Sequence, residues 1–243
     1  DSDTWVMGNV RSQVGAGQSL ATLSGTNYER NDKGQLLISP TTGLPTSTIA
    51  DFSVIGDRQP DFKMGIINNF GYKNVGLSFN LDLRKGGDVF NANELMMTIM
   101  GISKRTLDRE QPRVIQGILK DGLENTDNPT VNTIAINPYF RSSYYNGIFA
   151  EADYIENVNW LRMRDITLSY KFGSQVLSRQ KIIRSAVVFA TATDVFLITN
   201  YSGIDPNVNA LNSSNARGYG GAGIDWGAIP NPRTYNFGLK LGF

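Results

Sequence analysis

The chain ends on Asn231-Pro-Arg-Thr-Tyr-Asn-Phe-Gly-Leu-Lys-Leu-Gly-Phe243. From Tyr235 onward, apolar and polar residues alternate without a break. Because the side chains of a strand point alternately to opposite faces, this stretch predicts a strand with one apolar and one polar face. The apolar face carries Tyr235, Phe237, Leu239, Leu241 and Phe243, and the polar face carries Asn236, Gly238, Lys240 and Gly242. This division is typical of a strand whose apolar face meets lipid while its polar face lines a wet lumen.

Further strands are expected upstream, at residues 63–72, 75–84, 160–172 and 181–197. The first two are joined by Lys73-Asn74, and the second alternates without exception, so the pair predicts a hairpin. The third alternates in two phases that meet near Arg164, which predicts a β-bulge there. In the fourth, Val187 and Phe189 are expected to point outward. Weaker patterns predict a short strand at 5–10, a strand within 18–30 and a helix within 91–109.

The connections between these strands alternate between short and long. The long ones are residues 31–62, 85–159 and 197–230. Outer-membrane barrels have short periplasmic turns and long external loops, so the sequence predicts an all-β, antiparallel transmembrane barrel with Phe243 at the periplasmic end. About six strands are recognisable, whereas the smallest such barrels have about 8. We therefore expect further polypeptide to supply the missing strands, and Asp1 to be a processed or cut end.

The composition excludes several classes of function. The chain has 243 residues without histidine or cysteine, which excludes Ser-His-Asp triads, cysteine nucleophiles, disulfides and the usual zinc sites. A net charge of +1 and the lack of a basic stripe argue against nucleic acid as a partner. The sequence contains no run of about 18 apolar residues, so it predicts no membrane-spanning helix.

Three stretches resemble functional motifs but are better explained as loops without a catalytic or binding role. We expect no catalytic residue, cofactor or metal. Residues 218–223 fit G-x-G-x-x-G, but the following Ile224 to Pro230 cannot begin the helix that a dinucleotide site needs. Residues 205–209 have the oxygen spacing that opens a calcium loop, yet lack its later Gly and Glu. The acidic run Glu151, Asp153 and Glu156 is expected to be a solvated loop.

Two groups of residues are candidates for contacts with a ligand or a partner. One is a set of loop aromatics that could stack on sugars, dock a partner or form small cores within the loops: Tyr139, Phe140, Tyr144, Tyr145 and Trp226. The other is a set of charges expected to face the lumen, either paired with one another or binding a ligand: Asp82, Arg84, Arg162, Arg164 and Asp165.

Several stretches, in this order, resemble the C-terminal part of SusC/RagA-type TonB-dependent transporters. They are Val54-Ile55-Gly56-Asp57, Phe70-Gly71-Tyr72-Lys73, Trp160 to Tyr170, Asn200 to Pro206, and Gly223 to Tyr235. The chain departs from the family pattern at Asp194, where Asn is usual, and at Asn207, where Glu is common.

The resemblance implies a 22-stranded outer-membrane barrel of Bacteroidota with a plugged lumen. It also implies a SusD-like lipoprotein lid, energy from TonB, and import of oligosaccharides or oligopeptides. Residues 1–243 would then be the C-terminal part of that barrel, without the plug domain and the TonB box.

Two other readings remain open at this stage. The first is a complete small outer-membrane barrel that acts as an enzyme or as an adhesion or binding module. Without histidine, such an enzyme would need a Ser-Lys or carboxylate mechanism, and no clustered pair supports one. The second is a soluble, sandwich-like binding module.

Overall fold

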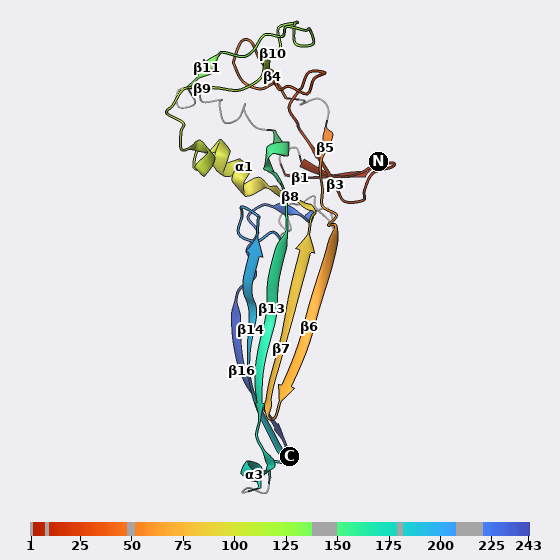
Figure 1. Cartoon of the computed structure of the whole chain (residues 1–243), viewed down its shortest axis with the longest axis vertical. Helices are drawn as coiled ribbons and strands as arrows, with labels where there is room; N and C mark the ends of the chain where they lie inside the picture. The colour runs from red at the N-terminus through yellow and green to blue at the C-terminus, as the bar shows by residue number, and fades with distance from the viewer. Residues whose placement is uncertain (1, 8–9, 48–51, 138–149, 179–181, 208–220) are drawn as a thin grey trace. The chain divides into compact units, whose positions relative to one another are not determined.

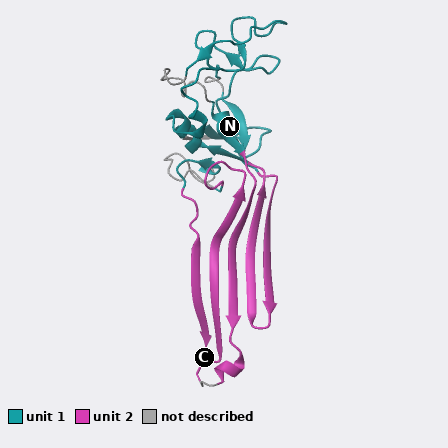
Figure 2. Cartoon of the chain, turned by 60° about the vertical axis from the view of Figure 1, so that its left-hand side comes forward, with its two compact units in different colours: residues 1–59, 88–156, 207–228 teal, residues 60–87, 157–206, 229–243 magenta. Residues whose placement is uncertain are grey.

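The computed structural model describes residues 2–7, 10–47, 52–137, 150–178, 182–207 and 221–243. It divides into two compact units, which Figure 2 shows in different colours. Unit 1 comprises residues 1–59, 88–156 and 207–228, and unit 2 comprises residues 60–87, 157–206 and 229–243. Within the described residues, no helix combines the length and the apolar content that crossing a membrane requires.

Unit 2 is built on one antiparallel sheet of long strands (Figure 1). In the order in which they lie side by side, the strands are β16 (Thr234–Gly242), β14 (Ser185–Thr199), β13 (Trp160–Lys171), β7 (Val75–Lys85) and β6 (Phe62–Tyr72). The predicted hairpin of β6 and β7 is confirmed, with Lys73 in its turn at φ 52°. The short helix α3 (Ser174–Leu177) lies in the connection from β13 to β14. Gly242 pairs with Ser185 at the start of β14, so β16 ends at the same end of the sheet as these short connections.

The predicted β-bulge near Arg164 is confirmed. The pairing of β13 with both of its neighbours shifts between Met163 and Asp165. On β14 the irregularity includes Asp194, whose φ of 48° lies in the left-handed region. The extra residue in β13 explains why the two halves of this strand alternate in opposite phases.

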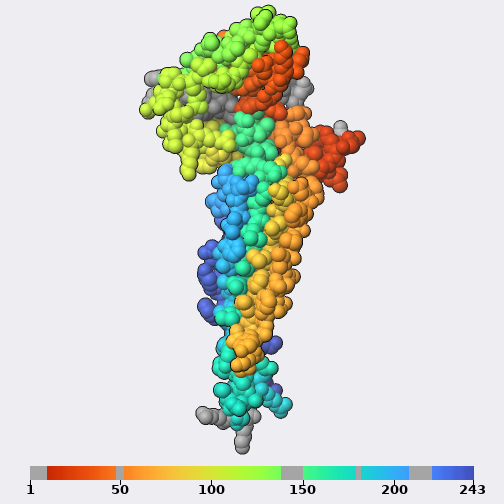
Figure 3. Space-filling view, in the orientation of Figure 1, coloured from red at the N-terminus to blue at the C-terminus, as the bar shows by residue number. Residues whose placement is uncertain are grey.

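The register gives the sheet one apolar and one polar face. Directly paired residues share a face, and Leu168 pairs with Leu77 on one side and Ala190 on the other. Ala190 in turn pairs with Phe237, and Leu77 with Phe70, so one apolar row crosses all five strands. Much of this face is open: Phe237 is 83% exposed and Leu168 is 55% exposed. In Figure 3 the side chains of β6 and β13 are visible along most of their length without another described segment over them.

The expectation for Val187 and Phe189 was wrong. Val187 pairs with Lys240 and Phe189 with Gly238, which places both on the polar face. A Cβ atom on Gly238 would lie 2.2 Å from the Phe189 ring, so the ring occupies the space that the missing side chain leaves. The sequence pattern misled because Val188, between the two, takes the apolar position opposite Leu239.

Unit 1 is formed mostly by the segments that join or precede the long strands. A four-stranded sheet orders β1 (Ser2–Met7), β2 (Val10–Val14), β3 (Thr22–Gly25) and β5 (Ser53–Asp57). A second sheet orders β12 (Ile155–Asn157), β8 (Asp88–Asn91) and β15 (Ile224–Asp225). Two-residue strands pair β10 (Ile118–Leu119) with β4 (Leu37–Ile38), and β11 (Ala135–Ile136) with β9 (Arg113–Val114). The predicted helix is shorter than 91–109: α1 covers Ala92–Ile99, and a 3₁₀ turn follows at Lys104–Thr106.

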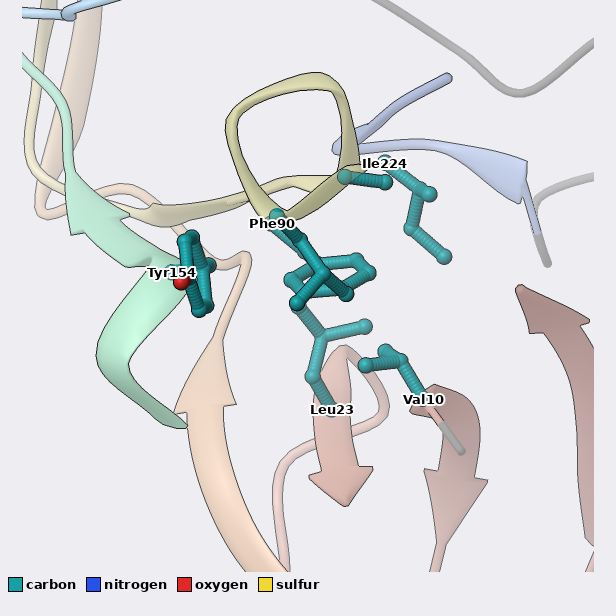
Figure 4. Close-up of a cluster of buried hydrophobic side chains, with 7 residues drawn as sticks. Val10, Leu23, Phe90, Tyr154 and Ile224 are labelled. Carbon is teal, nitrogen blue, oxygen red and sulfur yellow. The ribbon is translucent and has the colours of Figure 1, made fainter. Parts of the chain in front are cut away.

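The core of unit 1 joins segments that are far apart in the sequence. Val10, Leu23, Phe90 and Ile224 are fully buried, and Tyr154, from the 3₁₀ turn Glu151–Tyr154, is 3% exposed. Figure 4 shows these side chains converging from β2, β3, β8, β15 and the turn. The described parts of the long segments before β6, after β7 and after β14 therefore share one hydrophobic core, which holds these parts together.

A buried arginine links the same segments by hydrogen bonds. Arg58, 3% exposed, donates from Nε to the Ala21 carbonyl at 2.9 Å and from Nη2 to Ser12 Oγ at 2.6 Å. Its Nη1 donates to the carbonyl of Ala222 at 3.0 Å. The fork of the guanidinium thus joins three chain segments through backbone and side-chain acceptors.

Candidate functional site

The candidate site is the polar face of the sheet in unit 2, near the two bulges. Strand alternation directs Asp82, Arg84, Arg162 and Asp165 to this face, and the bulge adds Arg164. Arg162 pairs in register with Asp82, while Asp165 pairs with Asn80 of β7 and Thr193 of β14. The structure therefore brings the five predicted lumen-facing charges to neighbouring positions on two adjacent strands, β7 and β13.

Arg162 is the buried centre of this group. Its side chain is 3% exposed, and it donates from Nη1 to Asp194 Oδ1 at 2.9 Å and from Nη2 to Asp205 Oδ1 at 2.5 Å. Asp194 comes from the bulge of β14, and Asp205 from the segment that follows β14. A buried arginine with two carboxylates is favourable only when its geometry is tight, and removing one partner leaves a buried charge uncompensated.

A small pocket opens beside this ion-pair group. It has a volume of about 210 Å³, and its lining includes Arg162, Asp194, Asp205, Asn231 and Arg233. Arg233 Nε donates to the Asp194 carbonyl at 3.4 Å, so the segment before β16 lies against the bulge of β14. Polar donors and acceptors therefore line one part of this concave site, and apolar side chains line the rest: Phe196, Leu197, Ile204 and Pro230.

The remaining charges on this face have local partners. Arg164 and Asp82 form an ion pair through Arg164 Nε, with side chains 38% and 27% exposed. Arg84 Nε donates to the Gly86 carbonyl at 2.9 Å. Pairing within the predicted set thus accounts for Arg164 and Asp82, whereas Arg162 pairs with two carboxylates outside the set.

Sequence reasoning did not select Asp194 and Asp205 as site residues. Asp194 stood out only as a departure from a family pattern, and Asp205 only as the start of a weak calcium-like stretch. Neither signal predicts an arginine partner, because the β14 bulge and the turn after this strand bring both carboxylates to Arg162.

Most of the loop aromatics lie outside the described residues. Tyr139, Phe140, Tyr144 and Tyr145 fall within 138–149, and the first half of the G-x-G-x-x-G stretch, residues 218–220, falls within 208–220. Trp226 is described, and it packs against the core of unit 1. This placement matches the alternative in which an aromatic residue holds the long segments together.

Only part of the acidic run in unit 1 is solvated as the sequence predicted: Asp153 is exposed, whereas Glu151 is buried and Glu156 is half-buried. Glu151 is 2% exposed and accepts hydrogen bonds from the backbone N–H of Thr26 at 3.1 Å and from the Thr26 hydroxyl. Asp153 accepts from the Tyr28 hydroxyl at 2.5 Å, and Glu156 accepts from Asn91 Nδ2 at 2.9 Å. The three carboxylates fasten chain segments to one another. Across the described part of the chain, no group of three or more acidic, histidine or cysteine side chains is arranged to hold a metal.

Known proteins with similar sequences are TonB-dependent receptors. The chain is 26% identical over 227 residues to TonB-dependent receptor P3 of Formosa agariphila, a match that covers 93% of this chain and 20% of the relative. It is 24% identical over 186 residues to TonB-dependent receptor SusC of Bacteroides thetaiotaomicron, covering 75% of this chain and 15% of SusC. No protein-family model matches the chain.

Solved structures agree in fold. The chain superposes on the RagAB peptide importer in its closed-closed state with a TM-score of 0.56 at 17% identity, over 92% of this chain and 24% of that one. The open-open state of the same importer gives a TM-score of 0.55 at 16% identity, over 96% and 25%. The antiparallel sheet thus matches part of a transporter fold, and the chain spans a fifth or less of the length of the two relatives named above. These likenesses confirm the resemblance drawn from the sequence: the chain is similar in sequence to TonB-dependent receptors, SusC among them, and similar in fold to the RagAB importer.

Proposed function

We propose that the chain forms the C-terminal part of the barrel wall of a nutrient importer in the outer membrane of a Gram-negative bacterium. The observation that carries this proposal is the sheet of unit 2, whose apolar residues form continuous rows on one exposed face and whose charges gather on the other. Such a sheet places lipid on one side and water on the other.

The edges of the sheet support a larger wall. In the described chain, β6 and β16 each pair with a strand on one side only. Unpaired backbone groups in hydrocarbon cost several kcal/mol each, so both edges need neighbouring strands. We infer that the rest of the transporter supplies them and closes the barrel at 22 strands, with a plug in its lumen.

The long segments between the strands then face outward and contact cargo and partner. The proposed partner is a SusD-like lipoprotein lid, and the proposed cargo is an oligosaccharide or an oligopeptide, driven by TonB through the plug. Residues 31–62, 85–159 and 197–230 connect to the long strands at the strand ends opposite the short turns, which supports an external position. The relatives are named as receptors and importers, so transport is favoured over catalysis.

Protease treatment of intact cells tests the orientation. We expect cleavage within 85–159 or 197–230 in the full-length protein, while the turn at Lys73 stays protected until the outer membrane is opened. Protection of both long segments in intact cells would refute the proposed topology. The mass of the native gene product tests the alternative of a complete small barrel: about 26.7 kDa would favour that alternative, and a several-fold larger mass would favour the transporter.

A further inference from the structure

The apolar face of the sheet carries an open groove at the end where β6 begins. Its volume is about 490 Å³, and its lining includes Phe62, Leu83, Leu161, Ile198, Lys85 and Asn159. Leu161 pairs with Leu83 on one side and with Ile198 on the other, and Phe62 pairs with Lys85. The groove therefore lies on the same face as the rows of exposed apolar side chains.

The character of this face changes sharply at the groove. Leu83, Leu161 and Ile198 form the last fully apolar row, and Ile198 is 63% exposed. One row further out, the charged Lys85 lies opposite Phe62, and Asn159 precedes β13. An apolar surface that ends in a row with a cation and an amide has the profile of a hydrocarbon boundary.

Two hydrogen-bond donors are available at this boundary. Asn159 Oδ1 accepts from the Gly86 N–H at 3.0 Å, which fixes the amide and leaves its Nδ2 hydrogens as donors. The Lys85 side chain is exposed, and it forms no ion pair within the residues that the structure describes. An ammonium and an amide beside an apolar groove complement an anionic head group carried on an acyl chain.

We propose that this groove binds a phosphate-bearing membrane lipid, with its phosphate at Lys85 and Asn159 and an acyl chain along Leu83, Leu161 and Ile198. The inference rests on the proposed membrane position of the sheet. The apolar row excludes water from the chain, while the lysine and the amide select the head group, so the site distinguishes an anionic phospholipid from a neutral lipid.

Native mass spectrometry of the intact transporter in detergent tests this site, with phosphatidylglycerol as the probe and diacylglycerol as the neutral comparison. Lys85→Gln should weaken phosphatidylglycerol binding about fivefold, the effect of one lysine near an anionic lipid surface. Lys63→Gln is the matched control, because Lys63 pairs with Arg84 at the same end of the sheet but on the opposite face. Ile198→Trp, which fills the groove at an exposed position, should weaken binding of both lipids.

Equal affinities for wild type and Lys85→Gln, or an equal loss in both lysine variants, would overturn the proposal. Displacement of the lipid by millimolar inorganic phosphate alone would also overturn it, because the groove would then hold a free anion. Heat-modifiable migration on gels, measured for each variant, separates this failure from that of the proposed function. A protein that inserts normally but binds without dependence on Lys85 refutes only the lipid site, whereas a protein that never inserts refutes the barrel.

Discussion

An arginine on the apolar face should cost stability according to its depth along the sheet. On β13 this face runs from Leu161 to Tyr170, nine residue steps. At about 3.3 Å per residue and a tilt of about 40°, these steps span about 23 Å of membrane, close to the band of about 25 Å expected for such barrels. Ile166 lies within about 2 Å of the midpoint on this scale. Leu239 pairs with Val188, which pairs with Tyr170, so Leu239 lies at the margin.

This placement gives two different expectations for the same substitution. Ile166→Arg should destabilise the barrel by about 2–4 kcal/mol, and Leu239→Arg by about 0–1 kcal/mol, because the cost of a charge falls toward the interface. Ser78→Arg is the control at midplane depth. Ser78 adjoins Phe79, the partner of Ile166, but points to the polar face, so its arginine should reach water.

Urea unfolding of the intact transporter in phosphatidylcholine vesicles measures these differences, with heat-modifiable migration on gels as the readout. The expected order of destabilisation is Ile166→Arg first, then Leu239→Arg, with Ser78→Arg near wild type. A cost for Ser78→Arg equal to that of Ile166→Arg would refute the assignment of lipid and water to the two faces. Equal costs for Ile166→Arg and Leu239→Arg would refute the depth scale.

Three further predictions concern single contacts. Arg162→Ala should cost about 3–5 kcal/mol in the same unfolding assay, because two carboxylates lose their buried partner. A loss of stability no larger than that caused by breaking a solvent-exposed ion pair would contradict this expectation. Gly238→Ala should cost about 1–3 kcal/mol through its clash with the Phe189 ring, and adding Phe189→Ala should reduce that cost, as a double-mutant cycle would show. The hydrogen bond from Lys120 Nζ to Glu29 lowers the pKa of the Glu29 carboxyl. The contribution of this ion pair to the free energy of unfolding is therefore present above about pH 4.3 and is lost as the pH falls further. Hydrogen exchange around β4 and β10 should therefore differ between wild type and Glu29→Gln at pH 6, and this difference should shrink as the pH falls through the lowered pKa; a constant difference would refute the linkage.

The long strands were predictable because their signal is local. Alternation in 75–84 and 235–243 is a direct readout of the two faces of a sheet, so neither strand needs distant information to be recognised. The change of phase near Arg164 was visible for the same reason, because an inserted residue moves every later side chain to the other face. The hairpin at Lys73 follows from a two-residue connection between two such strands.

The packing of distant segments against one another in unit 1 was not predictable in this way. Its core side chains come from segments more than 200 residues apart, as with Val10 and Ile224, and each segment is too short to carry a period of its own. Glu151 looked like a solvated carboxylate because nothing in its neighbours shows that Thr26 lies beside it in space. Side-chain burial in such irregular segments depends on which distant segments pack together, and the local sequence pattern contains no information about this.

The same limit applies to the polar face of the sheet. Alternation alone assigns Arg162 to that face, since every second residue of a strand points the same way. Its partners Asp194 and Asp205 are set by the bulge of β14 and by the path of the chain after it, which only the folded structure shows. Strict alternation in the sequence thus determines which face of the sheet a residue occupies, because the face depends on immediate neighbours; it fails where apolar residues follow one another, as at Val187 to Phe189. Tertiary structure decides which residues meet there, because a bulge and a returning segment bring together positions that sequence distance keeps apart.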